Sequence, residues 1–552
     1  MAENTANDAP ANMRTVVIAS SAGTAFEWYD FFVFGTLSAV IGHNFFAQLN
    51  DTAGTLAALA LFGAGLLFRP VGAFIFGALG DRVGRKSAFL ITVTMMGVAT
   101  MAIGLLPTYA QAGPIAPILL VLLRIIQGTA LGGEWGGAAI YVAEHAPPDK
   151  RGANTAWIQT SAAFGLLGAL LVIYLVRTAM GEAAFTAPGW TGGWRLPFLL
   201  SAGLLAISIF MRMKLTESPS FQRLKDSGEA TKAPYREAFG HWPNLRIVLL
   251  VLFAFMVGQG AAWYTVFFYA QVFMQSFLRV APATANLLIM AITVASAPLY
   301  VVFATLSDRV GRKWVMWFGM TLMALFFFPG FHMIAGLANP ALTEAQARTP
   351  VSVIADPATC HVQFDVTGKA RFTSSCDLAK SVLSNAGVSY RNVAGPPGSV
   401  AQVRIGDTVV ASSDATGLTG PALAAVKSAV ENRIRTALTA AGYPATADPA
   451  RLNFWGIFGV LMIFVVGATA LYGPMAAALV ELFPTRIRYT ALSVPYHIGT
   501  GWIGGLAPVT SFAIVVATGN IYSGLWYPVI FTGISVVCCL LFLPETRGRP
   551  ID

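Results

Sequence analysis

Stretches of about 20 nearly uncharged residues recur along most of this chain, and they restrict its fold more than any other feature. A helix of that length crosses the roughly 30 Å hydrocarbon core of a bilayer. Only 11% of the residues are charged and 56% are hydrophobic, whereas an ordinary soluble domain carries about 25% charged residues. One soluble core cannot bury so much apolar surface, so the sequence predicts an all-α membrane protein.

Twelve membrane spans are predicted from the apolar runs between charged or Pro/Gly-rich breaks. The first six lie near 15–46, 54–79, 88–106, 115–143, 153–178 and 195–213. The last six lie near 244–272, 283–306, 314–335, 453–481, 489–518 and 523–543. A polar segment, 214–243, separates the two sets.

Lys and Arg are concentrated in alternate loops, which predicts the orientation of the chain because short loops rich in them stay in the cytoplasm. Both termini are therefore expected on the cytoplasmic side of a cell inner (plasma) membrane. This topology also accounts for the net charge of +9 without a nucleic-acid partner.

The two halves of the chain repeat each other. The decapeptide at 77–86, Gly-Ala-Leu-Gly-Asp-Arg-Val-Gly-Arg-Lys, returns at 304–313 as Ala-Thr-Leu-Ser-Asp-Arg-Val-Gly-Arg-Lys. A second motif of Glu, Pro and Arg, at 144, 147 and 151, returns with the same spacing at 481, 484 and 488. The sequence thus predicts two six-helix pseudo-repeats, as in transporters whose halves rock around a central site.

The second repeat contains an insertion. Asp81 and Glu144 are 63 residues apart, whereas the equivalent Asp308 and Glu481 are 173 apart, an excess of 110 residues between the ninth and tenth spans. The predicted organisation is an N-terminal half (1–213), a cytoplasmic linker (214–243), the first part of a C-terminal half (244–335), a periplasmic insertion domain (336–450) and the remainder of the C-terminal half (451–552).

The insertion is expected to be a small extracytoplasmic α+β domain. Its pattern predicts a strand at 361–366, a helix after Ser375, a hairpin across Gly406-Asp407 and a helix near 419–441. Cys360 and Cys376 both fall inside it, and two cysteines in one extracytoplasmic segment predict a disulfide.

Several motifs resemble a known family. The repeated Gly-Asp-Arg-Val-Gly-Arg-Lys loop resembles the signature of the major facilitator superfamily. The segments 27–31 (Glu-Trp-Tyr-Asp-Phe), 69–72 (Arg-Pro-Val-Gly), 132–135 (Gly-Gly-Glu-Trp) and 483–488 (Phe-Pro-Thr-Arg-Ile-Arg) resemble the metabolite:proton symporters. That family includes carriers for proline and betaine, α-ketoglutarate, shikimate and citrate. The resemblance implies proton-coupled symport of a small polar metabolite, with an organic acid as the expected class. Ala304 replaces the usual glycine of the second loop, which predicts a weaker second gate.

Charges at mid-membrane depth cost about 2.5–3.5 kcal/mol each on insertion scales and usually serve a function. Counting along the spans places five charged residues near the midplane and makes them candidates for proton or substrate binding: Glu27, Asp30, Arg69, Arg124 and Glu134. Asp30 shares a helix face with Glu27 and is the expected proton site, with Arg124 as its counter-charge. A permanent structural ion pair is the alternative interpretation. His497 is a candidate proton relay or a hydrogen-bonded structural residue.

The two signature loops are candidate gates. Each aspartate follows a helix and precedes a glycine turn, so it can accept bonds from nearby arginines or from the N-terminus of a facing helix and hold the cytoplasmic side closed. Alternatively, the basic residues only fix topology. The predicted gating residues are Gly77, Asp81, Arg82, Gly84, Arg85, Asp308, Arg309, Gly311 and Arg312.

Two other classes of function compete with transport. A membrane sensor could use a transporter scaffold with a ligand-binding outer domain, and a membrane enzyme is the second possibility. The sequence contains neither a Gly-x4-Gly-Lys-Ser/Thr phosphate loop nor a His-Glu-x2-His zinc motif, so no enzyme is predicted. The expected partners are a small-molecule substrate, protons and the lipid bilayer, without cofactor or metal, and the chain is expected to be a monomer.

Overall fold

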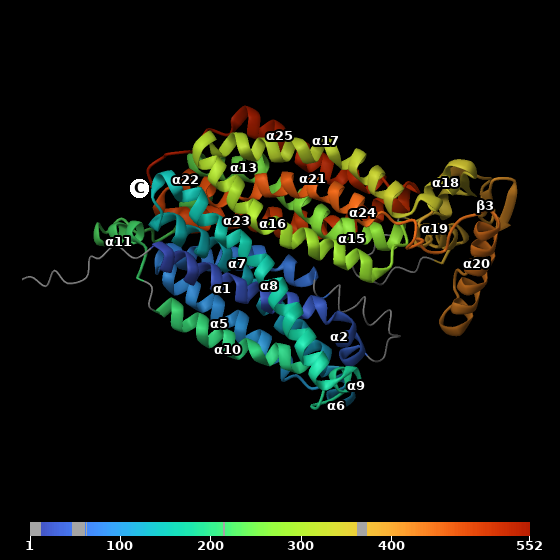
Figure 1. The fold of residues 1–552 in the computed structure, drawn as a ribbon, viewed down its shortest axis with the longest axis horizontal. Coiled ribbons are helices and arrows are strands. Elements are labelled where there is room, and N and C mark those ends of the chain that lie inside the picture. Colours follow the sequence, from blue (N-terminus) through green and yellow to red (C-terminus); the bar gives the residue numbers. More distant parts are fainter. Residues whose placement is uncertain (1–12, 47–60, 62, 214–215, 362–372, 552) are drawn as a thin grey trace, which may run out of the picture.

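The computed structural model describes residues 13–46, 61, 63–213, 216–361 and 373–551. Most of the described chain is helical, and the long helices lie side by side in a bundle (Figure 1). Ten helical segments in this part are long and apolar enough to cross a membrane. They are 85–104, 115–145, 148–180, 195–213, 242–277, 282–310, 312–338, 454–482, 485–518 and 523–542.

These ten segments match ten of the predicted spans to within a few residues. The first predicted span overlaps α1 (Met13–Thr36), which carries three charged residues, and α2 (Ser38–Phe45), which is only 8 residues long; both belong to the same bundle. The second overlaps α4 (Arg69–Arg82), and positions 54–60 lie outside the described residues. The total of twelve therefore stays a prediction.

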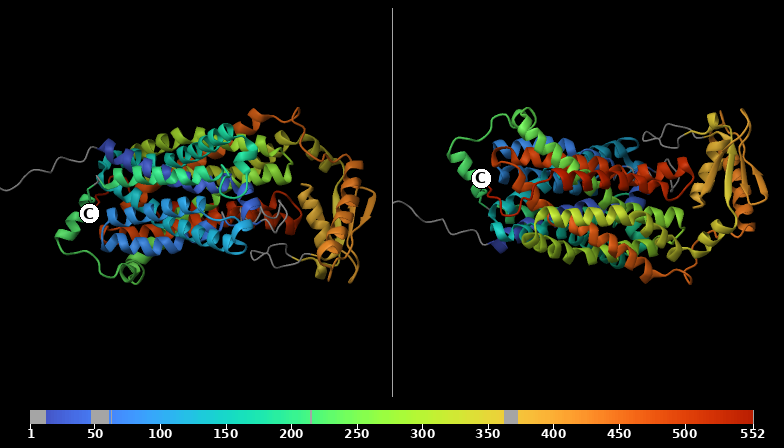
Figure 2. Two further views of the ribbon diagram at one scale, coloured as in Figure 1. Left: turned by 90° about the horizontal axis from the view of Figure 1, so that it is seen from below. Right: turned by 90° about the horizontal axis from the view of Figure 1, so that it is seen from above.

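The two halves form two groups of helices along one interface (Figure 1), and two further views show the insertion at one end of the bundle and the C-terminus at the other (Figure 2). The N-terminal group comprises α1, α2, α4, α5 (Arg85–Gly104), α6 (Tyr109–Ala112), α7 (Ile115–His145), α8 (Arg151–Met180), α9 (Glu182–Thr186) and α10 (Arg195–Met213). The linker carries α11 (Pro219–Asp226) and α12 (Pro234–Phe239).

The C-terminal group comprises α13 (Trp242–Val251), α14 (Val257–Tyr264), α15 (Ala270–Val272), α16 (Pro282–Val310), α17 (Arg312–Ala338), α21 (Phe454–Tyr472), α22 (Met475–Leu482), α23 (Arg488–His497), α24 (Gly505–Thr518) and α25 (Trp526–Phe542). Short π-helical turns join α13 to α14, α14 to α15 and α23 to α24. Helix α8 packs against α16, and α4 packs against α23, so these pairs form the interface between the halves.

A glycine stripe on α7 brings that helix unusually close to α4. A Cβ atom added at Gly128 would lie 2.0 Å from the carbonyl oxygen of Gly65, and one added at Gly132 would lie 2.0 Å from that of Arg69. Only glycine permits this backbone contact, which is the way small residues pack helices in membranes. The contact fixes Arg69 and Glu134 on neighbouring helices.

The insertion contains a four-stranded sheet and three main helices. They are α18 (Pro340–Arg348), β1 (Val351–Ala355), α19 (Ser375–Asn385), β2 (Tyr390–Ala394), β3 (Gln402–Ile405), β4 (Thr408–Ala411) and α20 (Gly420–Ala440). The strand order is β2-β1-β3-β4, with β1 parallel to β2 and antiparallel to β3. The predicted hairpin is present as β3 and β4, where Gly406 adopts a positive φ of 54°. The predicted strand at 361–366 lies outside the described residues except for His361.

A disulfide joins Cys360 to Cys376, whose Cα atoms are 5.2 Å apart. It ties the segment after β1 to the first turn of α19. His361 donates its backbone N–H to Asp377, and Nδ1 of its ring lies 2.8 Å from the second oxygen of the Asp377 carboxylate. This end of the insertion is therefore held by one covalent and two polar links.

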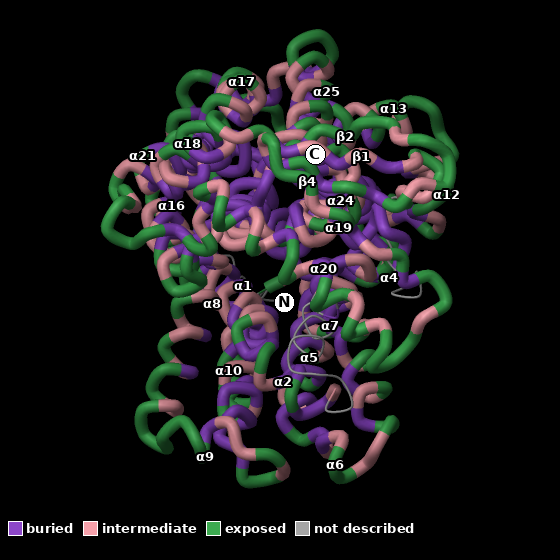
Figure 3. The backbone as a smooth tube through the Cα atoms, turned by 90° about the vertical axis from the view of Figure 1, so that its right-hand side faces the viewer, coloured by how far each residue is buried: buried purple, intermediate pink, exposed green. Residues whose placement is uncertain are grey.

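The insertion is attached to one end of the C-terminal group (Figure 1). Tyr390 donates its backbone N–H to Gly519 at 2.7 Å and its hydroxyl to Val516 at 2.7 Å. Arg279, with a positive φ of 58°, donates to the carbonyls of Asn385 and Ala445. Seen from the insertion's end, the sheet lies over the C-terminal helices and α20 lies near the interface between the two groups (Figure 3).

Candidate functional site

The first signature loop fastens the N-terminal half to the C-terminal half. Asp81, at the end of α4, accepts the backbone N–H groups of Tyr489 at 3.1 Å and Thr490 at 2.8 Å, which begin α23. Arg85 forms an ion pair with Asp81 at 3.1 Å and donates to the carbonyl of Thr485. A carboxylate at a helix N-terminus meets unpaired N–H donors and the positive end of the helix dipole. The loop thus forms a closed contact across the interface, as the aspartate motif predicts.

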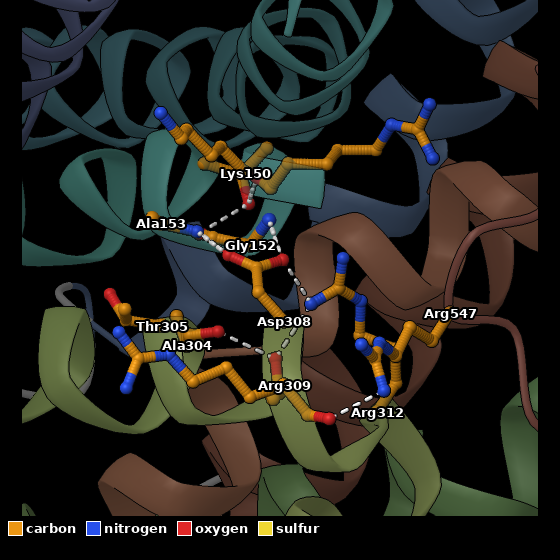
Figure 4. A network of polar contacts seen from close by, with 12 residues as sticks. Lys150, Gly152, Ala153, Ala304, Thr305, Asp308, Arg309, Arg312 and Arg547 are labelled. Atoms are coloured by element: carbon orange, nitrogen blue, oxygen red, sulfur yellow. Dashed lines mark hydrogen bonds and ion pairs between the residues drawn. The ribbon is translucent and has the colours of Figure 1, made fainter. Parts of the chain in front are cut away.

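The second loop forms the equivalent contact, in which an aspartate of the C-terminal half binds the start of a helix of the N-terminal half (Figure 4). Asp308, near the end of α16, accepts the backbone N–H groups of Gly152 at 2.9 Å and Ala153 at 2.8 Å, which begin α8. Arg312 forms an ion pair with Asp308 at 2.5 Å. We call these two contacts, centred on Asp81 and Asp308, the inner latches.

The expectation of a weaker second gate has no support in these contacts. Asp308 accepts as many backbone N–H groups as Asp81, over similar distances. Gly77 packs against the backbone of Thr490, whereas the carbonyl of Ala304 packs against Gly152, which has no side chain. A glycine therefore lies at both interfaces, Gly77 at the first and Gly152 at the second.

Two reciprocal ion pairs extend the latches. Arg488 binds Glu144 at 2.5 Å, and Arg151 binds Glu481 at 2.8 Å, all with nearly buried side chains. Each pair joins the two halves, and the two pairs are equivalent because Glu144 matches Glu481 and Arg151 matches Arg488 in the repeat. Arg312 also contacts Glu481 at 3.3 Å, so the second latch and its ion pair form one network.

The remaining signature residues shape the turns. Gly84 and Gly311 adopt φ values of 128° and 117°, which L side chains rarely adopt, so both positions favour glycine. Arg82 and Arg309 are exposed. The carbonyl of Arg309 accepts a bond from Arg547, which links the second loop to the C-terminal segment (Figure 4).

Two of the predicted acidic residues meet at an arginine that the sequence analysis did not select. Arg212 of α10 forms ion pairs with Glu27 of α1 at 3.3 Å and with Glu134 of α7 at 2.6 Å. Thr92 donates its hydroxyl to the second oxygen of Glu134 at 3.0 Å. All three charged side chains are at most 3% exposed. Arg212 lies one residue before the end of the predicted sixth span, so counting depth from the span end excluded it.

Asp30 and Arg124 do not form the predicted pair: among the described residues no ion pair joins them. Asp30 accepts a hydrogen bond from the hydroxyl of Ser201 on α10. Arg124 donates to Gln127 at 2.7 Å, and Gln127 donates to Thr100 at 2.7 Å. Asp30 and Arg124 therefore each bind a neutral side chain, which sequence spacing could not reveal.

A cavity lies between the halves, and Arg69 is the one charged residue among its described lining residues. The lining comprises Trp28, Arg69, Gln159, Ala162, Ala163, Gln259, Trp263, Tyr264, Phe267, Thr293, Ser296, Tyr300, Tyr472, Tyr496 and Thr500. Arg69 donates to the hydroxyl of Tyr264 at 3.4 Å, and its guanidinium lies 5.9 Å from the centre of the Tyr496 ring. This arrangement offers a cation surrounded by aromatic faces and amide groups.

His497 follows the cavity residue Tyr496 and is fully buried. Neither ring nitrogen has a hydrogen-bond partner among the described residues. The structure therefore does not show the hydrogen-bonded structural role that was the alternative for this residue. Its proton-relay role stays a prediction.

Comparisons with known proteins agree with the motifs. Residues 15–244 match the family described as "Sugar (and other) transporter". The chain is 36% identical to the inner membrane metabolite transport protein YhjE of Escherichia coli, over 61% of this chain and 76% of that protein. It is 37% identical to the shikimate transporter of Escherichia coli, over 58% of this chain and 72% of that protein. It is 28% identical to the glycine betaine/proline/ectoine/pipecolic acid transporter OusA of Dickeya dadantii, over 98% of this chain and 85% of that protein.

Solved structures share the fold. A double tryptophan mutant of XylE aligns with a TM-score of 0.64 at 16% identity, covering 97% of both chains. The proton:xylose symporter XylE bound to 6-bromo-6-deoxy-D-glucose aligns with a TM-score of 0.61 at 17% identity, covering 98% of this chain and 97% of that one. At this identity the likeness concerns the fold alone.

Proposed function

This chain belongs to the major facilitator superfamily, and from that premise we propose that it is a proton-coupled symporter of a small polar metabolite that works by alternating access. The observation that carries the proposal is the pair of inner latches. They close one end of the interface, while a cavity whose described lining residues include one cation, Arg69, lies between the same two halves. Two halves joined by exchangeable polar contacts around a central site are what alternating access requires.

A substrate with a carboxylate suits this cavity best. Arg69 offers a planar fork that binds carboxylates in a bidentate manner, and no acidic residue is present among the described lining residues to neutralise it. An organic acid is therefore the proposed substrate class. Shikimate, named for one of the relatives, is a carboxylate of this kind.

A zwitterion is the second candidate, and the aromatic lining favours it. Trp263 lies within 6.4 Å of the rings of Tyr264, Phe267 and Tyr472, so several aromatic faces converge near Arg69. Aromatic faces attract quaternary ammonium groups. A betaine could place its carboxylate on Arg69 and its cation on these rings, and betaine transport is named for another relative.

The proposal includes a topology. The chain would cross the membrane twelve times with both termini in the cytoplasm, so the inner latches would face the cytoplasm and 336–450 would lie outside. The structure then corresponds to a state closed to the cytoplasm. The transporter is proposed to act as a monomer in the bacterial inner membrane.

Uptake into proteoliposomes tests the function. Purified protein would be reconstituted with an imposed inward proton gradient and supplied separately with labelled shikimate, α-ketoglutarate, citrate, proline and glycine betaine. Accumulation that disappears with a protonophore supports symport. Saturable binding of one compound without uptake under any gradient would instead favour a membrane sensor.

A further inference from the structure

The cluster of Glu27, Glu134 and Arg212 has an unbalanced charge. Two ionised carboxylates and one guanidinium would leave one net negative charge in the interior, because all three side chains are at most 3% exposed. An uncompensated buried charge is costly, and a carboxyl group in such a site takes up a proton instead. The composition of the cluster thus favours one proton bound between the two acids.

A second observation points to the same proton. The oxygen Oε2 of Glu27 is buried and has no hydrogen-bond partner in the described part of the chain. The carboxyl groups of Glu27 and Glu134 lie beside each other, because one oxygen of each contacts the same Nη2 atom of Arg212, at 3.3 Å and 2.6 Å. Two ionised carboxylates can only accept hydrogen bonds, and they repel each other, whereas one bound proton supplies the missing donor between them. An unpartnered acceptor beside a second carboxylate is the geometry of a shared proton.

Helix α7 connects this cluster to both functional regions through three consecutive residues. The carbonyl of Gly133 accepts a hydrogen bond from the hydroxyl of Tyr489. Glu134 binds Arg212. Trp135 stacks on Tyr496 with ring centres 3.7 Å apart, and Tyr496 lines the cavity.

Tyr489 extends the connection to a latch. Its backbone N–H binds Asp81, while its fully buried ring lies against glycines of α4 and α7. Cβ atoms added at Gly80 and Gly137 would lie 2.0 Å and 2.5 Å from this side chain. A side chain of the C-terminal half therefore fills a space in the N-terminal half that only glycines leave open, and this contact exists while the latch is closed.

We infer that Glu27 and Glu134 form a proton-binding site, separate from Asp30, and that residues 133–135 transmit its occupancy to the inner latch and the cavity. The inference rests on the proposed alternating-access function. With the proton bound, the cluster is balanced and the Gly133–Tyr489 contact is retained. Loss of the proton leaves two carboxylates around one guanidinium, which displaces Glu134 and loosens Tyr489. Deprotonation should therefore open the latch.

The direction of the pH effect separates this site from the latch carboxylates. The charged and titratable groups around the cluster are Arg212 from α10, and Tyr489, Asp81 and Arg85 at its latch side; α5 contributes the neutral Thr92. Protonation of Asp81 would weaken the latch as pH falls. Deprotonation of the cluster would instead open the latch as pH rises.

The test measures the latch directly, with the proton as the ligand. Spin labels would be attached to cysteines at Val83 and Val310, exposed positions beside the two signature loops, after Cys538 and Cys539 are replaced by alanine. Double electron–electron resonance would be recorded on the full chain in liposomes between pH 5 and pH 9. The ratio of the long-distance to the short-distance population should rise with pH, by up to about tenfold per pH unit for one proton.

Glu27→Gln should abolish this rise, and so should Glu134→Gln, which serves as the test if the first variant yields no folded monomer. Glu182→Gln, which removes an exposed carboxylate from α9, should keep the rise. A wild-type rise in both glutamine variants would overturn the inference, as would two populations whose ratio in the wild type does not change with pH. A single population at every pH and with every compound of the uptake panel would instead count against alternating access itself.

Discussion

Arg69 is the residue on which substrate binding should depend most. It is the one charged group among the described cavity residues, and removal of one partner of a buried charge pair costs about 2–5 kcal/mol. Arg69→Gln should therefore weaken binding of the transported carboxylate at least tenfold, or about 1.4 kcal/mol. Arg69→Lys should lose less, because it keeps the charge but not the planar fork.

The measurement is equilibrium binding of whichever compound of the uptake panel the wild type accumulates. Arg177→Gln is the matched control, because Arg177 is an exposed arginine paired with Glu182 on the surface. If Arg69→Gln binds the compound with wild-type affinity, Arg69 does not hold its carboxylate.

The sequence predicted the buried charged residues of the candidate site more accurately than it predicted which of them form pairs. Depth along a predicted helix selected Glu27, Glu134 and Arg69, all of which are buried at the interface or in its core. It paired Asp30 with Arg124, because spacing gives the depth of a residue but not the direction in which its helix faces its neighbours. Arg212 was missed because a long side chain near a helix end can reach inward from the last turn.

At the scale of elements, the two inner latches should contribute equally to closure. Each aspartate accepts two backbone N–H groups at a helix N-terminus and pairs with one arginine. Hydrogen bonds to charged groups contribute about 1.5–3 kcal/mol each. Asp81→Asn and Asp308→Asn should each raise the long-distance population of the Val83 and Val310 labels by about tenfold or more.

Asn154→Ala provides the control for this comparison, because Asn154 lies beside the second latch and its side chain donates to the carbonyl of Lys150, just before its own helix. The two aspartate variants should agree within about a factor of three, since equivalent contacts differ by this much with context. A large effect of Asp81→Asn with none for Asp308→Asn would restore the weaker second gate that Ala304 suggested.

The disulfide should determine the local stability of α19. Cys360 and Cys376 are 16 residues apart, and closing a loop of about 15 residues contributes roughly 3 kcal/mol by restricting the unfolded chain. Replacing both cysteines with serine should speed hydrogen exchange of α19 by about 100-fold in the full-length protein. Unchanged exchange would mean that the contacts between His361 and Asp377 hold this helix alone.

The predictability of elements followed the strength of local signals. Ten apolar spans and the Gly-Asp hairpin were found because length and turn chemistry are local properties. Strand β1 was not predicted, because its short run of apolar residues gains its strand partners from β2 and β3, more than 30 residues away. Non-local pairing of this kind leaves little trace in one segment of sequence.

At the scale of the whole molecule, the insertion should move as one body with the C-terminal half. Its polar links run to the ends of that half that we propose lie outside the cell membrane, through Tyr390 to Gly519 and through Arg279 to Asn385. The backbone of Gly387 also packs directly against that of Phe277. If the halves rock during transport, α20 must therefore change its distance from the N-terminal half while its distance from the C-terminal half stays fixed.

Three exposed positions allow both distances to be measured: Val409 in β4, Trp455 at the start of α21 and Thr191 before α10. Spin-label distances between Val409 and Trp455 should be the same in the wild type and in Asp81→Asn, which we expect to open the inner latch. Distances between Val409 and Thr191 should differ between them, since opening at the inner end requires the outer ends to approach. A change in the first distance of the same size as in the second would show that the insertion moves independently, and the rigid attachment through Arg279 and Tyr390 would then be wrong.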